Sequence, residues 1–100
     1  MKGRTALVIG GTTGIGRAAA IAFGAAGANV FIVGLGSAEG KDVEAEVRGT
    51  GVEAMFVEAD VTRESEVKAV VARAAERFGR IHMAVNNAGV EGRLDRKSVV

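Results

Sequence analysis

The sequence predicts an α/β protein in which a parallel sheet carries helices on both faces. Short apolar runs alternate along the chain with segments of helical periodicity, an order typical of βαβ units. The apolar runs are continuous, as expected of strands that helices cover on both sides. Glycines separate the segments, which indicates short turns between them. With 100 residues, the chain has room for one domain at most.

In the first half of the chain, two strands flank a helix. The first expected strand is Thr5–Ile9, and the second is Val30–Val33. The helix between them runs from Gly14 to about Ala26 and is so rich in alanine that it is apolar nearly all round. Gly27 is a natural stop for this helix.

Two more helix–strand pairs follow. A helix is expected from about Ala38 to Arg48, and a strand over Val52–Val57. The next helix, from about Arg63 to Phe78, is amphipathic, and Thr62 is well placed to cap it. The fourth strand is expected over Ile81–Val85.

Right-handed crossovers then predict the strand order 3-2-1-4. The first two helices are expected on one face of the sheet and the third on the other, with the fourth strand left as an unpaired edge. Ligands bind such sheets outside the carboxyl ends of the strands, where the strand order reverses. The segments Gly10–Gly16 and Asn86–Gly89 both fall at this place.

Composition excludes several classes of function. Thirteen basic and twelve acidic residues are interleaved, so the charge predicts no nucleic acid and no membrane partner. No apolar run approaches the roughly 18 residues of a membrane span. The chain has no cysteine, which rules out disulfides and thiolate metal sites, and no metal site is expected. We expect a cytoplasmic protein.

The segment Gly10–Gly16 follows a strand and opens a helix, as in the Rossmann type of parallel sheet. Gly10 allows a sharp turn, Gly14 leaves space for a pyrophosphate at the helix N-terminus, and Gly16 lets the helix approach the sheet. The free N–H groups and the positive end of the helix dipole suit phosphate. The alternative is a glycine-rich turn that packs a helix on a strand without any ligand.

Gly10-x-x-x-Gly14-x-Gly16, followed about 70 residues later by Asn86–Gly89, resembles the short-chain dehydrogenase/reductase family. The resemblance covers Met1 to about Gly89. It implies NAD or NADP as cofactor and hydride transfer between an alcohol and a carbonyl in a full-length protein that forms homo-oligomers. The rival interpretation is a non-catalytic dinucleotide-binding module, and a third is a fragment without function.

The resemblance also implies roles for individual residues. Asp60 matches the acid that accepts a hydrogen bond from the adenine amino group, although it could instead serve as a second cap near the third helix. Asn87 matches a residue of the loop beside the cofactor's riboses, although Asn86–Asn87 could be a plain turn. The residues expected to contact the cofactor are Gly10, Thr12, Thr13, Gly14, Ile15, Gly16, Leu35, Asp60, Val61, Asn87, Ala88 and Gly89.

The position that selects between NAD and NADP carries no charge. An acid that binds the ribose 2′-hydroxyl is expected at the end of the second strand, where this chain has Gly34. Leu35 and Thr13 stand where NADP-dependent members often carry basic residues. The choice of cofactor therefore stays open, and Ser37 could donate one hydrogen bond to either form.

Two further positions depart from the family pattern. Ile9 replaces a common threonine, which removes a hydroxyl that could tie the first strand to Asn86–Gly89. His82 replaces an aspartate at the start of the fourth strand, and we expect a surface residue there rather than a metal ligand.

The resemblance places the catalytic serine, tyrosine and lysine beyond Gly89, and the chain contains no tyrosine. We therefore assign no catalytic residue and expect the chain to be inactive alone. Residues 1–94 are expected to form the N-terminal part of a truncated NAD(P)-binding domain. Asp95–Val100 matches one frame of a common sequencing adapter, which predicts a non-native tail; the alternative is a solvated basic tail. With its open edge, such a fragment is expected to be marginally stable, and molten or oligomeric.

Overall fold

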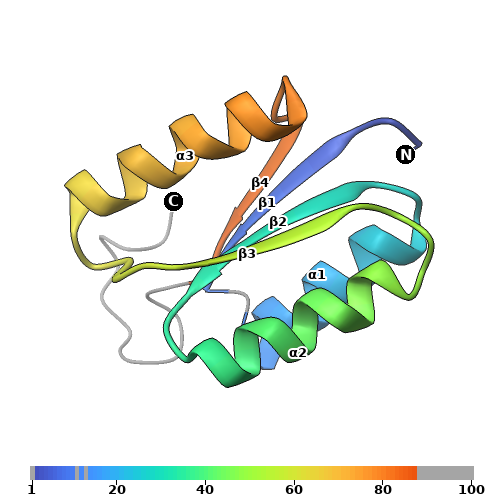
Figure 1. Ribbon diagram of the computed structural model, residues 1–100, viewed down its shortest axis with the longest axis horizontal. Coiled ribbons are helices and arrows are strands. Elements are labelled where there is room, and N and C mark those ends of the chain that lie inside the picture. Colours follow the sequence, from blue (N-terminus) through green and yellow to red (C-terminus); the bar gives the residue numbers. More distant parts are fainter. Residues whose placement is uncertain (1, 11, 13, 88–100) are drawn as a thin grey trace.

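The computed structural model describes residues 2–10, 12 and 14–87. It contains a four-stranded parallel sheet and three helices (Figure 1). In chain order the elements are β1 Thr5–Ile9, α1 Gly14–Ala25, β2 Asn29–Gly34, α2 Ser37–Arg48, β3 Ala54–Glu58, α3 Glu64–Phe78 and β4 Met83–Asn86. The sheet order is β3-β2-β1-β4, so the predicted topology is confirmed. The tail predicted at Asp95–Val100 lies outside the described residues.

The sheet separates two apolar cores. Figure 1 shows α1 and α2 on one face and α3 on the other, as the sequence predicts. The core beneath α1 and α2 consists of Val8, Ala20, Val30, Ile32, Val43, Val47 and Ala54. The core beneath α3 consists of Leu7, Ile9, Phe31, Val33, Ala59, Val70 and Ala74. Successive side chains of β1 and β2 enter opposite cores, which explains why these strands are apolar without interruption.

The third helix does not use its predicted cap. Helix α3 begins at Glu64, and Arg63 is the N-cap residue with extended backbone angles and no side-chain hydrogen bond to the helix. The Thr62 hydroxyl instead donates to Asp60 Oδ1 over 2.6 Å. The prediction that Thr62 caps α3 is therefore wrong, because a local turn takes up its hydroxyl.

Strands β3 and β4 each begin two residues later than predicted. The Glu53 N–H donates to the side-chain Oδ1 of Asn29, over 3.1 Å, instead of to a main-chain carbonyl, so the regular pairing of β3 starts at Ala54. At the start of β4, the Thr5 N–H donates to Nδ1 of His82 over 3.0 Å. The pairing of β4 with β1 therefore begins at Met83. In both places a side chain takes the place of a ladder carbonyl.

Side chains of α2 cover the outer edge of β3. The Phe56 N–H donates to Glu44 Oε2 over 2.8 Å, and Arg48 Nε donates to the carbonyl oxygen of Ala54 over 3.1 Å. These are main-chain groups of an edge strand that point away from β2 and would otherwise be open to another strand. Helix α2 thus packs on the sheet and also closes its edge.

Among the described residues, no helix is long and apolar enough to cross a membrane. The same residues contain no group of three or more histidine, cysteine or acidic side chains that could hold a metal ion.

Candidate functional site

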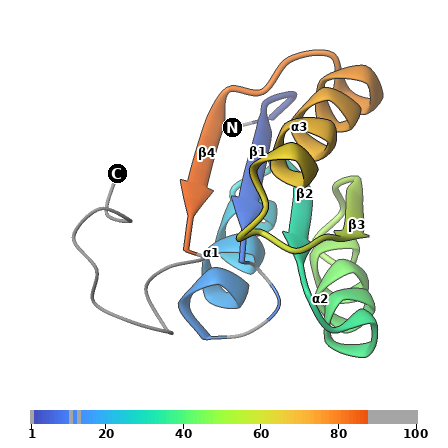
Figure 2. The same ribbon diagram turned by 90° about the vertical axis from the view of Figure 1, so that its left-hand side faces the viewer.

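The predicted site residues that the structure describes follow the carboxyl ends of all four strands. Gly10, Leu35 and Asn87 come directly after β1, β2 and β4. Asp60 is the second residue after β3. Because the strands are parallel, these ends lie at one edge of the sheet (Figure 2). Thr13, Ala88 and Gly89 lie outside the described residues.

Two residues of the glycine loop, Gly10 and Gly14, have positive φ angles. Gly10 has a φ of 82° and Gly14 a φ of 58°, values that side chains disfavour. The Gly10 N–H donates to the Val33 carbonyl oxygen over 2.7 Å, which fixes the turn at the junction of β1 and β2. Gly16 is buried and Thr12 is half-buried. The first turn of α1 contains no acidic residue, so no carboxylate of that turn opposes an anion at the helix N-terminus.

Two large apolar side chains at this edge face solvent. Ile15, in the first turn of α1, is 66% exposed, and Leu35, just after β2, is 59% exposed. Every other described aliphatic or aromatic side chain of comparable size is at least partly covered. Exposed apolar side chains beside a glycine loop and a helix N-terminus suit contact with a bound organic group. Both residues belong to the set predicted to contact the cofactor.

Asp60 is held in a tight turn. Its Oδ1 accepts the Thr62 N–H over 3.0 Å as well as the Thr62 hydroxyl. These two hydrogen bonds, helped by the positive charge of Arg63, hold the pKa of the Asp60 carboxyl below its usual value. Asp60 is therefore a carboxylate at neutral pH, able to accept further hydrogen bonds.

The main chain around Asp60 is fixed by α3. Glu66 Oε1 accepts the Asp60 N–H over 2.8 Å. The Val61 side chain packs against the core beneath α3. Glu66 lies in the first turn of α3, and no sequence pattern indicates that it positions Asp60.

Asn87 joins the end of β4 to the end of β1. Its N–H donates to the Ile9 carbonyl oxygen over 2.8 Å, and its Nδ2 donates to the Gly10 carbonyl oxygen over 3.5 Å. The residue is 6% exposed. Ile9 has no hydroxyl to join β1 to the end of β4. The main chain and side chain of Asn87 make this connection instead and hold β4 against the start of the glycine loop.

Sequence reasoning missed Glu58, the last residue of β3. Its Oε2 accepts the Gly36 N–H over 3.2 Å, and its Oε1 accepts the Ser37 hydroxyl over 3.1 Å. Ser37, which the sequence offers as a possible donor to either form of the cofactor, already donates to a carboxylate. Only the register of β2 with β3 shows that Glu58 lies beside this turn, because it pairs Glu58 with Gly34.

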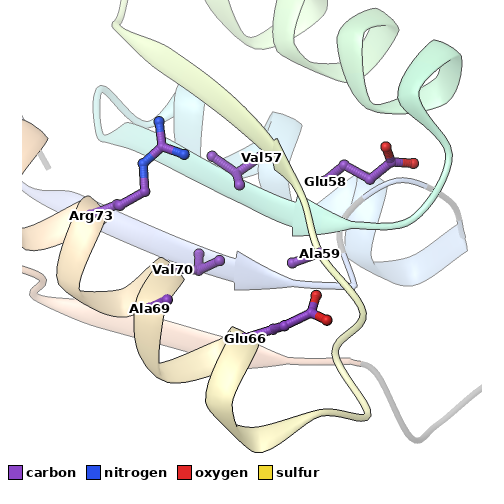
Figure 3. A pocket seen from close by; sticks show the side chains of 7 residues that line it. All are labelled: Val57, Glu58, Ala59, Glu66, Ala69, Val70 and Arg73. Carbon is purple, nitrogen blue, oxygen red and sulfur yellow. The ribbon is translucent and has the colours of Figure 1, made fainter.

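A separate cavity of about 210 Å³ lies between β3 and α3 (Figure 3). Its lining residues are Val57, Glu58, Ala59, Glu66, Ala69, Val70 and Arg73. None of them belongs to the set predicted to contact the cofactor. The cavity nevertheless adjoins the carboxyl ends of the strands, because the carboxylate of Glu58 also binds Gly36 and Ser37 there.

Comparison with known proteins agrees with this geometry. Residues 4–99 match the family described as short chain dehydrogenase. An uncharacterized oxidoreductase, YgcW of Escherichia coli K12, is 40% identical over 90 residues, which are 90% of this chain and 34% of that protein. The chain therefore spans about a third of the length of that relative.

Solved structures of a dehydrogenase and a ketoreductase are also similar to this chain. The structure of an NAD+-bound xylitol dehydrogenase superimposes with a TM-score of 0.84 at 34% identity, over 88% of this chain and 34% of that one. An actinorhodin polyketide ketoreductase with NADPH gives a TM-score of 0.80 at 40% identity, over 86% and 33% of the two chains. One of these two similar structures holds NAD+ and the other NADPH.

Proposed function

The chain belongs to the short-chain dehydrogenase/reductase family, and we propose that it forms the dinucleotide-binding part of an NAD(P)-dependent oxidoreductase. The whole protein interconverts an alcohol and a carbonyl by hydride transfer. In this proposal the nicotinamide ring, when bound, supplies or accepts the hydride. The residues of this chain bind and orient the cofactor.

One observation carries the proposal. The only large apolar side chains that are strongly exposed in the described part of the chain, Ile15 and Leu35, flank a glycine loop at the carboxyl edge of the sheet. The edge thus combines apolar surface with main-chain donors at the N-terminus of a helix. This combination fits a dinucleotide, which carries a charged pyrophosphate between two flat organic groups.

Each residue has a distinct role in the proposal. The loop from Gly10 to Gly16 binds the pyrophosphate through main-chain N–H groups. The Asp60 carboxylate accepts a hydrogen bond from the adenine amino group. Asn87 keeps the end of β4 against Gly10, the first residue of this loop.

Proton transfer is not assigned to any residue of this chain. The reaction needs a group that exchanges a proton with the substrate oxygen, and the family places a tyrosine there. The chain has no tyrosine. We therefore propose that the chain alone binds the cofactor without turnover. The exposure of Ile15 and Leu35 beside the glycine loop fits a second candidate equally well, a dinucleotide-binding module without catalysis.

Isothermal titration calorimetry of the chain with NADH and with NADPH tests whether the chain binds a dinucleotide. Gly10→Ala introduces a side chain at a φ of 82° beside the expected phosphate site. Gly79→Ala is its matched control, because Gly79 has a φ of 87°, open space around it, and a position after α3 at the opposite edge of the sheet. Both variants carry a similar backbone cost.

We expect saturable binding of at least one dinucleotide, weakened roughly tenfold or more by Gly10→Ala and little changed by Gly79→Ala. Absence of binding to a chain that is folded by circular dichroism would contradict the proposal. Equal weakening by both variants would show that the glycine loop is not the site. Activity of the complete protein, measured with NAD+ and an alcohol, separates the enzyme from the non-catalytic module.

A further inference from the structure

The acid that the sequence lacks at the end of β2 is present on the neighbouring strand. Gly34 pairs with Glu58 in the parallel register of β2 and β3, and the Ala59 N–H donates to the Gly34 carbonyl oxygen over 3.1 Å. Glu58 is therefore the lateral neighbour of the position where an acid that binds the ribose 2′-hydroxyl is expected. Gly34 has no side chain to fill that position.

The Glu58 side chain reaches across to the segment that follows Gly34. Figure 3 shows it leaving β3 toward the start of α2, away from α3. Its two oxygens accept hydrogen bonds from the Gly36 N–H and from the Ser37 hydroxyl. The carboxylate thus lies at the N-terminus of α2, within the turn that joins β2 to that helix.

These contacts bear directly on which cofactor can bind. The Gly36 N–H and the Ser37 hydroxyl are donors that a 2′-phosphate could use, and Glu58 occupies both. A second carboxylate, that of Glu39, lies in the first turn of α2, against Gly36. The segment 33–39 contains no lysine or arginine to balance these charges. A phosphate placed here would face carboxylates in place of cations.

A ribose 2′-hydroxyl meets a different environment. A carboxylate offers about four lone-pair positions, and the two hydrogen bonds from Gly36 and Ser37 use only two of them. Glu58 can therefore accept one more hydrogen bond from a hydroxyl group while keeping its present partners.

We propose that Glu58 is the residue that determines cofactor specificity, and that it makes the site select NAD over NADP. The inference rests on the proposed dinucleotide site at the carboxyl edge. Glu58, at the end of β3, thus supplies the carboxylate that sheets of this type usually carry at the end of β2. Ser37 and Gly36 act as positioning groups that hold the carboxylate.

The test compares dissociation constants of NADH and NADPH for the chain and for Glu58→Gln. Glutamine keeps the size of the side chain and one acceptor oxygen but removes the charge. Glu53→Gln is the matched control, since Glu53 is also exposed and lies at the opposite, amino end of β3. The ratio of the two constants is measured on the same sample, so it does not depend on the fraction of folded protein.

We expect NADH to bind at least tenfold more tightly than NADPH, and Glu58→Gln to reduce this ratio roughly tenfold, since like-charge contacts are costly. Raising the salt concentration should also reduce the ratio in the unmodified chain, because ions screen the repulsion. Glu53→Gln should leave the ratio unchanged. Glu58→Ala, which removes both charge and acceptor, should weaken NADH binding as well.

A ratio that stays within twofold in Glu58→Gln would overturn the role of Glu58 while leaving the dinucleotide site intact. Preference of the unmodified chain for NADPH would also overturn it. Failure of the folded chain to bind either dinucleotide would instead contradict the proposed function, and with it this inference.

Discussion

The side-chain amide of Asn87 donates to the main-chain carbonyl oxygen of Gly10, 77 positions earlier in the chain, over 3.5 Å. The Asn87 N–H binds the Ile9 carbonyl oxygen immediately beside it. One residue thus anchors the last described strand to the first residue of the glycine loop. A change at Asn87 should therefore affect both stability and cofactor binding.

We expect Asn87→Ala to lower the free energy of unfolding by about 1 kcal/mol, the usual value of one hydrogen bond. It should also weaken dinucleotide binding, because the end of β4 loses its fixed position beside Gly10. Asn29→Ala is the control: Asn29 Oδ1 accepts the Glu53 N–H and joins β2 to β3 at the other edge of the sheet. Denaturant unfolding and calorimetric titration measure the two effects. If both variants weaken binding equally, Asn87 has no specific link to the site.

Helix α2 packs against Phe56 through a glycine. A Cβ added to Gly40 would lie 2.2 Å from the Phe56 ring, so the ring would have to move. Gly40→Ala should gain about 1 kcal/mol in helix propensity. Overpacking should cost about 1–3 kcal/mol, which leaves a net loss of stability.

The double variant Gly40→Ala, Phe56→Leu tests the cause of that loss. If the loss comes from the ring, the double variant should be more stable than the sum of the single changes implies. Additive effects in thermal unfolding would place the loss elsewhere.

The stability of the turn at Asp60 should depend on pH. The folded pKa of Asp60 is lowered, first by the Thr62 hydroxyl and then by the Thr62 N–H. The contribution of the Asp60 carboxylate to folding stability is therefore fully present above the unfolded pKa of about 3.9. It is lost as the pH falls through the lower pKa of the folded state. Thr62→Val removes the hydroxyl donor and should raise the folded pKa toward its ordinary value. Carbon-13 NMR of the Asp60 carboxyl measures this, and identical titrations in the two proteins would contradict it.

His82 has a structural role despite its exposure. Its Nδ1 accepts the N–H of Thr5, a residue that is only 1% exposed. His82→Leu should cost about 1–3 kcal/mol, because this N–H loses its partner. His82→Asn should retain much of the stability, since asparagine Oδ1 can occupy the place of Nδ1. Equal losses of unfolding free energy in the two variants, measured by chemical denaturation, would show that this hydrogen bond does not stabilise the fold.

The sequence predicts the sheet order and the two-sided packing correctly, because continuous apolar strands and right-handed crossovers leave few alternatives. It predicts a sharp turn at Gly10, and the structure has a positive φ at that residue. It does not predict partners of polar side chains. The Thr62 hydroxyl had two acceptable partners, a helix terminus and Asp60, and propensity alone favoured the wrong one. The contacts of Glu58 and His82 were not predicted, because they depend on the register between strands, which no local pattern contains.

The covered edge of β3 protects the sheet against the addition of another strand on that side. Glu44 and Arg48 already bind the outward-facing main-chain groups of Phe56 and Ala54. A strand from elsewhere, in the same protein or in another copy, would have to displace these side chains to add there. Breaking two hydrogen bonds is therefore the cost of adding a strand beside β3, and α2 is the element that imposes it.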